Sequence, residues 1–237
     1  MLWRITNTAD PVPGSLQTFF GGYKQFGRQY KYSVSPKLAT QQHDMAMYFD
    51  VSVHKYYKAL QKAQDAGLIA KTPMQQLNGS EPLVAVWIGS SRALEKRPYI
   101  PDIQSFLLSE YQNMLPRYII MDDDIKLYRQ EFYPLNYFIR EAQAVGADYI
   151  IIAEMDGHQP RNSQNWYINM NQSVFNANGG LINVISISKL VSPVSGNMHA
   201  AVYAVKEGRT QLKQYLPFIK TRYNKTPQWI SLGEVEN

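Results

Sequence analysis

The sequence GADYIIIAE, residues 146–154, decides the fold of this chain. Its apolar run is long enough for a strand that is buried on both faces, and it follows directly on a helical pattern that stops at the first glycine. A second apolar run lies upstream at Leu83–Ile88, and a third lies between them at Tyr118–Met121. We expect the three runs to be neighbouring strands of one sheet. Val84, Ile119 and Ile151 would then lie side by side.

Helical patterns separate the three predicted strands. Between the first two, residues 102–115 repeat apolar side chains at helical spacing, Asp102 stands at the N-cap position and Pro116 ends the segment. Between the second and third, residues 127–145 show a helical pattern that Pro134 breaks into two pieces. The order strand, helix, strand, helix, strand is typical of a sheet with helices packed on it.

A β-hairpin is predicted after the central strand. Residues 156–160 are expected to form a loop, and residues 166–171 alternate apolar and polar side chains, as a strand with one solvent-facing side does. Asn176–Gly180 has the composition of a hairpin turn. Residues 181–190 are predicted to form the second strand of the hairpin. Their apolar side chains change face after Val184, which indicates a β-bulge.

The segment before the sheet falls into two parts. Residues 1–36 combine glycine and proline with many aromatic side chains, so we predict an irregular arm that covers its own domain or a neighbouring subunit. Residues 38–70 are predicted to form a helix that stops at Gly67, with Tyr56 on its apolar stripe.

The segment after the hairpin completes the predicted fold, which is α/β with a mixed α+β sheet. Three βα units are followed by an antiparallel hairpin, helices pack on the sheet, residues 198–205 add a third antiparallel strand, and residues 208–223 form a helix that Pro217 kinks. We divide the chain into an irregular aromatic arm, a helical extension with a linker, an α/β sheet domain, and a C-terminal helix with a tail, at residues 1–36, 37–80, 81–205 and 206–237.

Composition excludes several classes of function. With 45% hydrophobic residues the chain is able to bury a substantial core, but its longest apolar runs are far shorter than the roughly 20 residues that a membrane-spanning helix needs. The absence of cysteine excludes disulfides, thiolate metal sites and cysteine nucleophiles. The net charge is +5, and the excess of basic residues lies mainly in residues 206–225. These residues form either a solvated helix face or a surface for an acidic partner such as anionic lipid. Nucleic acid is not the expected partner.

Residues 82–192 resemble the α/β domain of the CsgG, LpoB and TolB N-terminal group of bacterial outer-membrane accessory proteins. The resemblance rests on LVAVW (83–87), LPRYII (115–120), AQAVGADYII (142–151) and the turn at 176–180. The chain departs from the group because it has no cysteine for lipid attachment, and its flanking segments lie outside the match. Such domains act by contact in oligomeric secretion or peptidoglycan-synthesis assemblies and carry no catalytic residues.

The resemblance therefore implies a non-catalytic scaffold in a multi-subunit, outer-membrane-associated complex such as a secretion system. It implies other protein subunits as partners in a homo- or hetero-oligomer, a periplasmic or outer-membrane-associated location with the cytoplasm as the alternative, and no cofactor. The aromatic arm and the basic C-terminal helix are the expected docking elements, with contacts from Phe19, Phe20, Tyr23, Phe26, Lys213, Lys220, Arg222 and Trp229.

Acidic residues after two of the predicted strands support a second hypothesis, a metal-dependent nucleotide-sugar glycosyltransferase. Carboxylates at strand ends hold a divalent metal and a nucleotide diphosphate in such enzymes. Residues 156–160, DGHQP, also resemble the acidic-Gly-Gln-His-Pro loop of polyprenyl-phosphate sugar transferases. Against this hypothesis, the interval between the acidic groups has a helical pattern, and a run of aspartates is often a solvated turn. The candidate metal ligands are Asp122, Asp124, Glu154, Asp156 and His158.

The two hypotheses predict different responses to ligands. A glycosyltransferase would melt at a higher temperature with manganese or magnesium plus a nucleotide sugar, because a ligand that binds only the folded state stabilises it. Asp124→Ala or Asp156→Ala would abolish that shift. For a contact scaffold we expect no shift in differential scanning fluorimetry, and a shift that either substitution removes would contradict the scaffold hypothesis.

Overall fold

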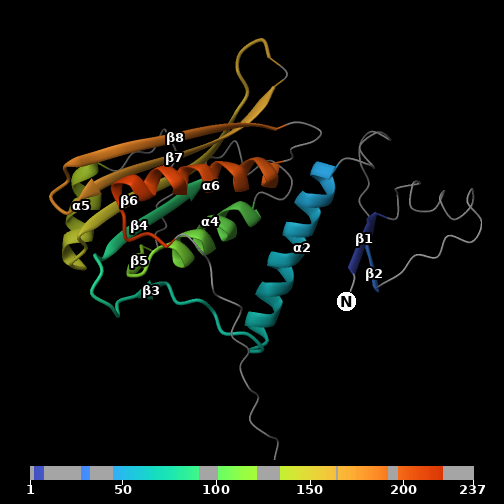
Figure 1. The fold of residues 1–237 in the computed structure, drawn as a ribbon, viewed down its shortest axis with the longest axis horizontal. Helices are drawn as coiled ribbons and strands as arrows, with labels where there is room; N and C mark the ends of the chain where they lie inside the picture. Colours follow the sequence, from blue (N-terminus) through green and yellow to red (C-terminus); the bar gives the residue numbers. More distant parts are fainter. Residues whose placement is uncertain are drawn as a thin grey trace, which may run out of the picture.

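The computed structural model of the chain describes residues 3–7, 28–32, 45–90, 101–121, 134–163, 165–191 and 197–220. Within these residues, six strands form one sheet in the order β3-β5-β4-β6-β7-β8 (Figure 1). The strands are β3 (Gln75–Gln76), β4 (Val84–Ser90), β5 (Tyr118–Ile120), β6 (Tyr149–His158), β7 (Trp166–Asn176) and β8 (Leu181–Val191).

The three strands predicted from the apolar runs lie at the centre of this sheet. Strand β4 runs parallel to β5 on one side and to β6 on the other. Its Ala85 lies opposite Ile119, and its Val86 lies opposite Ile151. The predicted α/β fold class with a mixed sheet is therefore confirmed, including the antiparallel hairpin that follows β6.

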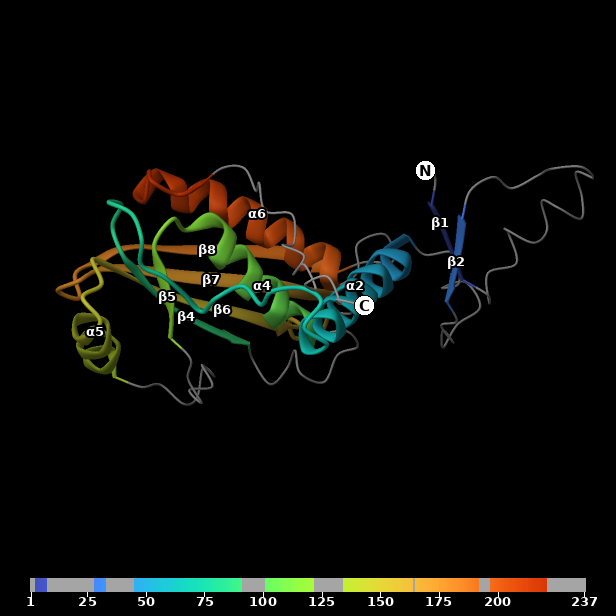
Figure 2. The same ribbon diagram turned by 90° about the horizontal axis from the view of Figure 1, so that it is seen from below.

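Helices cover both faces of the sheet to different extents. The helices are α2 (Met45–Asp65), α4 (Pro101–Met114), α5 (Leu135–Ala144) and α6 (Asn197–Tyr215). Figure 2 shows α4 and α6 on one face of the sheet and α5 at one end of the other. Among the described residues, no helix is long and apolar enough to cross a membrane.

The two faces of the sheet form two separate cores. The larger core lies under α4 and α6 and includes Val86 and Ile151 from the central strands. The smaller core lies under α5, where the rings of Trp87 and Phe138 meet edge to face with their centres 5.1 Å apart. Because β4 and β6 contribute to both cores, their sequences are apolar on both sides, as the unbroken apolar runs predicted.

Helix α2 buries a different face from the one that the sequence predicted. It ends before Gly67, as predicted, and the φ of +69° at Gly67 explains why glycine stands there. Tyr56, which we placed on the apolar stripe, is 55% exposed, whereas Asp50 and Val51 are buried. The stripe was wrong because the N-terminal half of the helix contacts the larger core, through Phe49 and Val53.

Two predicted segments belong to other elements. The predicted loop at residues 156–160 is wrong for its first three residues, which continue β6 to His158 because they pair with residues 167–169 of β7. The predicted strand at residues 198–205 is also wrong, because these residues form the first half of α6. Their buried side chains, among them Met198, Ala201 and Val205, recur at helical spacing.

The extent of α6 also changes the predicted organisation of the C-terminal part of the chain. The helix begins at Asn197 and ends at Tyr215, so the boundary that we placed after residue 205 falls within it, and Pro217 follows the helix instead of kinking it. The rest of the predicted division into segments stays a prediction.

The hairpin between β7 and β8 has the predicted turn and a bulge. Gly179 has a φ of +81°, which suits the glycine in this turn. The pairing shifts where Val174 faces Asn183 and Phe175 faces Leu181, so Ile182 is the extra residue. The bulge therefore lies closer to the turn than the predicted position after Val184.

The predicted arm at residues 1–36 is not irregular throughout. The described residues there form two strands, β1 (Trp3–Asn7) and β2 (Arg28–Tyr32), which pair in parallel in a small separate sheet. The glycine- and proline-rich composition hid them because each strand is only 5 residues long.

Gly208 lets α6 lie close to β7. A Cβ atom at this position would come within 2.5 Å of Nε2 of Gln172. That side chain is fully buried, and its Oε1 accepts a hydrogen bond of 2.5 Å from the hydroxyl of Tyr111. The close approach of helix and sheet therefore depends on the missing side chain.

We expect Gly208→Ala to destabilise the protein. Alanine favours a helix over glycine by about 0.8–1 kcal/mol, but crowding a packed core costs about 1–3 kcal/mol, so the net loss should be about 1 kcal/mol. Urea denaturation followed by circular dichroism measures the change, with Gln214→Ala at an exposed position of α6 as the control. A variant at least as stable as the wild type would contradict this account of the packing.

Candidate functional site

The face of the sheet that α4 and α6 do not cover carries a regular grid of side chains, here called the ribbon face. The register of β6, β7 and β8 aligns these side chains in four rows across the strands. The rows are Ile152, Ser173 and Val184; Glu154, Asn171 and Ser186; Asp156, Asn169 and Ser188; and His158, Tyr167 and Leu190. Apolar or aromatic side chains thus stand at the two ends, and polar ones lie between them.

Hydrogen bonds connect neighbouring members of the ribbon face. The hydroxyl of Ser186 donates to Oδ1 of Asn171 at 2.6 Å, and the amide nitrogen of Asn169 lies 2.7 Å from Nδ1 of His158. The rings of His158 and Tyr167 stack with their centres 5.5 Å apart. These contacts fix the orientation of Ser186, Asn171, Asn169 and His158, whereas Asp156 in the middle of the face is buried.

Only three of the five predicted metal ligands lie among the described residues. Glu154, Asp156 and His158 stand at alternate positions of β6 and share the ribbon face, whereas Asp122 and Asp124 lie outside the described residues. Over the part of the chain that the structure describes, no three His, Asp or Glu side chains are grouped to hold a metal ion.

Two exposed apolar side chains belong to this face. Leu181, Val184 and Leu190 of β8 are 58%, 51% and 43% exposed, and Val184 and Leu190 stand on the ribbon face, whereas the exposed Tyr203 and Tyr215 belong to α6 on the other side of the sheet. Sequence analysis interpreted the change of apolar face after Val184 as a bulge and did not identify the exposed side chains. The signal was the combination of Val184 and Leu190 with the serines at alternate positions, since one face cannot be both serine-rich and buried.

The predicted interaction residues are mostly beyond what the structure describes. Lys213 is exposed on α6, and Lys220 is exposed after it, where its backbone N–H donates to the carbonyl of Met114 at 2.8 Å. The described residues do not include Phe19, Phe20, Tyr23, Phe26, Arg222 and Trp229.

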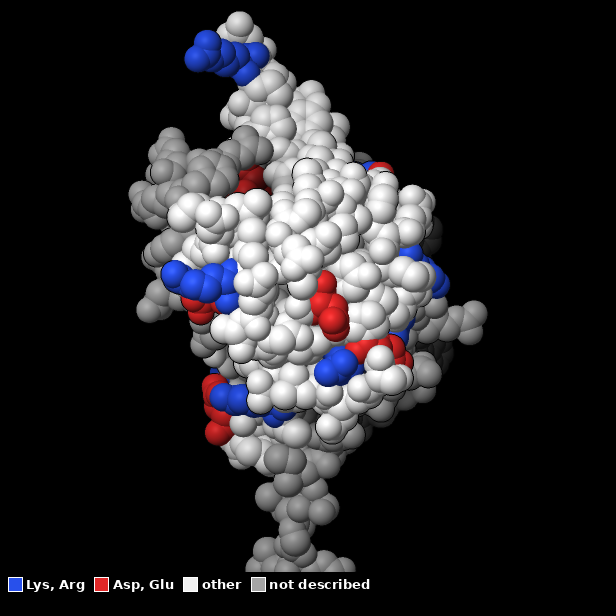
Figure 3. Space-filling model, turned by 90° about the vertical axis from the view of Figure 1, so that its left-hand side faces the viewer, with Lys and Arg blue, Asp and Glu red and all other residues white. Residues whose placement is uncertain are grey.

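Charge is dispersed on the end of the molecule that carries α5 and the β7–β8 turn. Figure 3 shows basic and acidic side chains lying near one another there, separated by uncharged surface. A broad basic patch of the kind that nucleic-acid binding requires is not visible in this view. Contacts to this end would therefore depend on shape and polarity more than on net charge.

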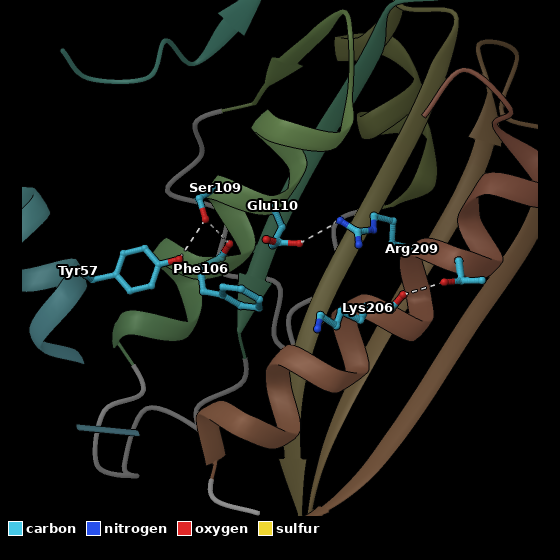
Figure 4. A network of polar contacts seen from close by, with 7 residues as sticks. Tyr57, Phe106, Ser109, Glu110, Lys206 and Arg209 are labelled. Carbon is cyan, nitrogen blue, oxygen red and sulfur yellow. Dashed lines mark hydrogen bonds and ion pairs between the residues drawn. The ribbon is translucent and has the colours of Figure 1, made fainter. Parts of the chain in front are cut away.

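A cavity of about 790 Å³ opens between α2, residues 71–74 and α4. Its lining includes Tyr57 and Lys58 from α2 and Ser109 and Gln112 from α4. The hydroxyls of Tyr57 and Ser109 lie 3.1 Å apart, and Ser109 donates to the carbonyl of Phe106 at 2.8 Å (Figure 4). These bonds hold the two helices together along one wall of the cavity.

An ion pair joins the two helices of the larger layer. Figure 4 shows Glu110 of α4 and Arg209 of α6 pointing toward each other, with Oε2 and Nη1 3.9 Å apart. Their side chains are only 12% and 18% exposed. Burial raises the pKa of Glu110 to about 7, while the charges of Arg209 and Lys206 act in the opposite direction.

A second buried carboxylate ties α2 to α6. Oδ1 of Asp50 accepts a hydrogen bond of 3.0 Å from the backbone N–H of Met198, in the first turn of α6. A carboxylate at this place is favourable because a helix N-terminus carries partial positive charge and unpaired N–H groups. Burial nevertheless raises the pKa of Asp50 to about 6, although hydrogen bonds from the N–H groups of Met198, His199 and Asn197 lower it.

The fold and these features define a mixed α/β domain. No family model matches the chain, and no curated protein matches it. Solved structures with a related fold do exist, and three of them are described next.

One is the PelC dodecamer from Paraburkholderia phytofirmans, with 10% identity and a TM-score of 0.41 over 59% of this chain and 94% of that chain. A lipoprotein from Neisseria meningitidis has 12% identity and a TM-score of 0.33 over 57% of this chain and 99% of that chain. The LpoB C-terminal domain from Salmonella enterica has 12% identity and a TM-score of 0.29 over 48% of this chain and 87% of that chain.

LpoB, one of the three members named in the sequence resemblance, is among the solved structures that the comparison found. The CsgG and TolB parts of that resemblance stay predictions.

The two raised pKa values predict how stability depends on pH. Because the folded-state pKa of Glu110 is about 7 against an ordinary 4.5, and that of Asp50 about 6 against 3.8, the folded state binds protons more tightly than the unfolded state. The stabilisation is therefore fully present below pH 4 and is lost as the pH rises through 6 and 7.

We expect the free energy of unfolding to fall between pH 5 and pH 8, by roughly 2–3 kcal/mol from Glu110 alone. Glu110→Gln should remove that part of the slope and leave the smaller change at lower pH that comes from Asp50. Chemical denaturation at several pH values measures both contributions. An unchanged slope in Glu110→Gln would contradict the assignment.

Proposed function

We propose that this chain is a non-catalytic component of a bacterial envelope assembly and that it works by protein–protein contact. The observation that carries the proposal is the set of exposed apolar side chains on the last strand of the sheet. Leu181, Val184 and Leu190 of β8 are exposed, and Val184 and Leu190 stand on the ribbon face, away from α6. Aromatic and aliphatic side chains grouped at the surface are typical of protein interfaces.

The construction of the domain supports a contact role. Gln172, Tyr111, Glu110 and Arg209 keep the sheet and its helices in register, and the ribbon face is held by its own hydrogen bonds. A rigid surface loses little conformational freedom when it binds, so it favours a stable complex. Such a design suits a scaffold, whose partners must meet a fixed shape.

The location in this proposal derives from the sequence resemblance of residues 82–192 to envelope accessory proteins. We place the protein in the periplasm or at the outer membrane, in a complex such as a secretion system, with other protein subunits as its partners. The aromatic side chains of residues 1–36 and the basic residues of 206–225 would add contacts beyond the described core.

The proposal predicts that the full chain co-purifies with other envelope proteins after mild cross-linking of native membranes. Deleting residues 1–36 should reduce the size of the assembly in size-exclusion chromatography with light scattering, because the arm's aromatic side chains then no longer contact a neighbouring subunit. Replacing Phe19, Phe20, Tyr23 and Phe26 by alanine should reproduce the effect of the deletion.

Lys58→Ala, which changes an exposed lysine of α2 far in sequence from these elements, serves as the control and should leave the assembly unchanged. A full chain that recovers no envelope protein, and whose solution size is the same with and without the arm, would refute the proposal.

A further inference from the structure

The two edge strands of the six-stranded sheet differ greatly in length. One edge is β3, which has only 2 residues, Gln75 and Gln76. The other edge is β8, which has 11 residues and pairs with β7 along its length. In the described residues, no strand pairs with the outer side of β8. Every second residue of an edge strand directs its N–H and C=O outward, so β8 presents an extended row of hydrogen-bonding groups.

Strand β8 has few of the features that keep an edge from pairing. It contains neither proline nor glycine, and its one charged residue is Lys189. That charge is engaged in an ion pair with Glu207 of α6, and the bulge at Ile182 disturbs only the end near the turn. Natural proteins blunt exposed edges with proline, free charge, bulges or short strands. A long edge without them is favourable for strand addition.

We propose that the outer edge of β8 pairs with β8 of a second copy of this chain, antiparallel and around a two-fold axis. The inference rests on the proposed contact function and names the partner of one surface. A second copy is favoured over head-to-tail addition because the opposite edge offers only the two residues of β3. Only another β8 is long enough to pair with β8 along its whole length. Pairing of two identical edges gives a closed dimer with two-fold symmetry.

One register of this pairing is favoured by the side chains. Centred on Ser186, it places Ile185 opposite Ile187, Val184 opposite Ser188 and Asn183 opposite Lys189 of the second copy, as follows from the sequence of β8. The isoleucines, which α6 covers in each copy, then continue as one apolar row. A centre at Ile187 would put Ile185 opposite Lys189, and a centre at Lys189 would oppose two like charges, so both are disfavoured.

The test uses two double variants of the full chain at the exposed positions 184 and 188. In the proposed register these positions face each other twice across the two-fold axis. Val184→Lys with Ser188→Lys therefore opposes like charges at both places, whereas Val184→Glu with Ser188→Lys opposes unlike charges. Within one chain the two positions lie roughly 13 Å apart along the strand, so the charges act mainly between copies.

We expect the wild-type chain to dimerise in sedimentation velocity experiments at micromolar concentration. The double-lysine variant should dimerise about tenfold more weakly or worse, and the glutamate–lysine variant should recover most of the wild-type affinity. Raising the salt concentration should reduce the difference in dimer affinity between the two variants, because salt screens the charges. Matching thermal melts of the variants establish that both are folded.

A wild-type chain that stays monomeric at about 100 µM would overturn the inference, since specific dimers of this kind are expected to form well below that concentration. Equal dimerisation of the two double variants would overturn it too, because the interface would then lie elsewhere. Neither result affects the recovery of envelope partners by the full chain, which tests the proposed function separately. Loss of those partners with an intact β8 dimer would instead refute the function and leave this pairing standing.

Discussion

The parallel pairing of β4 with β6 is the constraint on which the rest of the structure depends. The two strands pair over seven successive positions, from Val84 opposite Tyr149 to Ser90 opposite Met155, and they contribute side chains to both cores. Parallel strands need a connection that crosses one face of the sheet, so this pairing dictates where α4, β5 and α5 must run. Burial of Val86, Ile150 and Ile151 on opposite sides of the sheet then binds both helical layers to the same two strands.

The larger helical layer is held by polar groups that are costly to bury. Glu110 and Arg209 join α4 to α6, and Asp50 joins α2 to the beginning of α6. Apolar packing alone would let these helices slide, whereas each of these bonds forms at one relative position. Fixed helices in turn keep β7 and β8 flat against α6, so the ribbon face and the outer edge of β8 retain a defined shape. The contact surface thus depends on buried charges on the far side of the sheet.

The sequence predicted the centre of the fold well and its surface poorly, for physical reasons. Long apolar runs such as Ile150–Ala153 have few alternatives to a strand buried on both faces, and Asn176–Gly180 has few alternatives to a turn. Residues 198–205 were misassigned because their alternation of small and apolar side chains fits two periods, and only the contact of Ala201 and Val205 with the sheet decides for a helix. The ribbon face was invisible in the sequence because its members come from three strands, and the register that aligns Asp156, Asn169 and Ser188 is a property of pairing.

The bond between Asp50 and Met198 joins residues 148 positions apart in the chain. Helix α2 is made early in synthesis, but its acceptor site at the start of α6 exists only after nearly the whole sheet domain has left the ribosome or the translocation channel. Until then the apolar side chains of α2, such as Phe49 and Val51, have no surface to cover, and contacts between such distant residues form slowly. The final packing of α2 is therefore completed only after the chain beyond Met198 has been made.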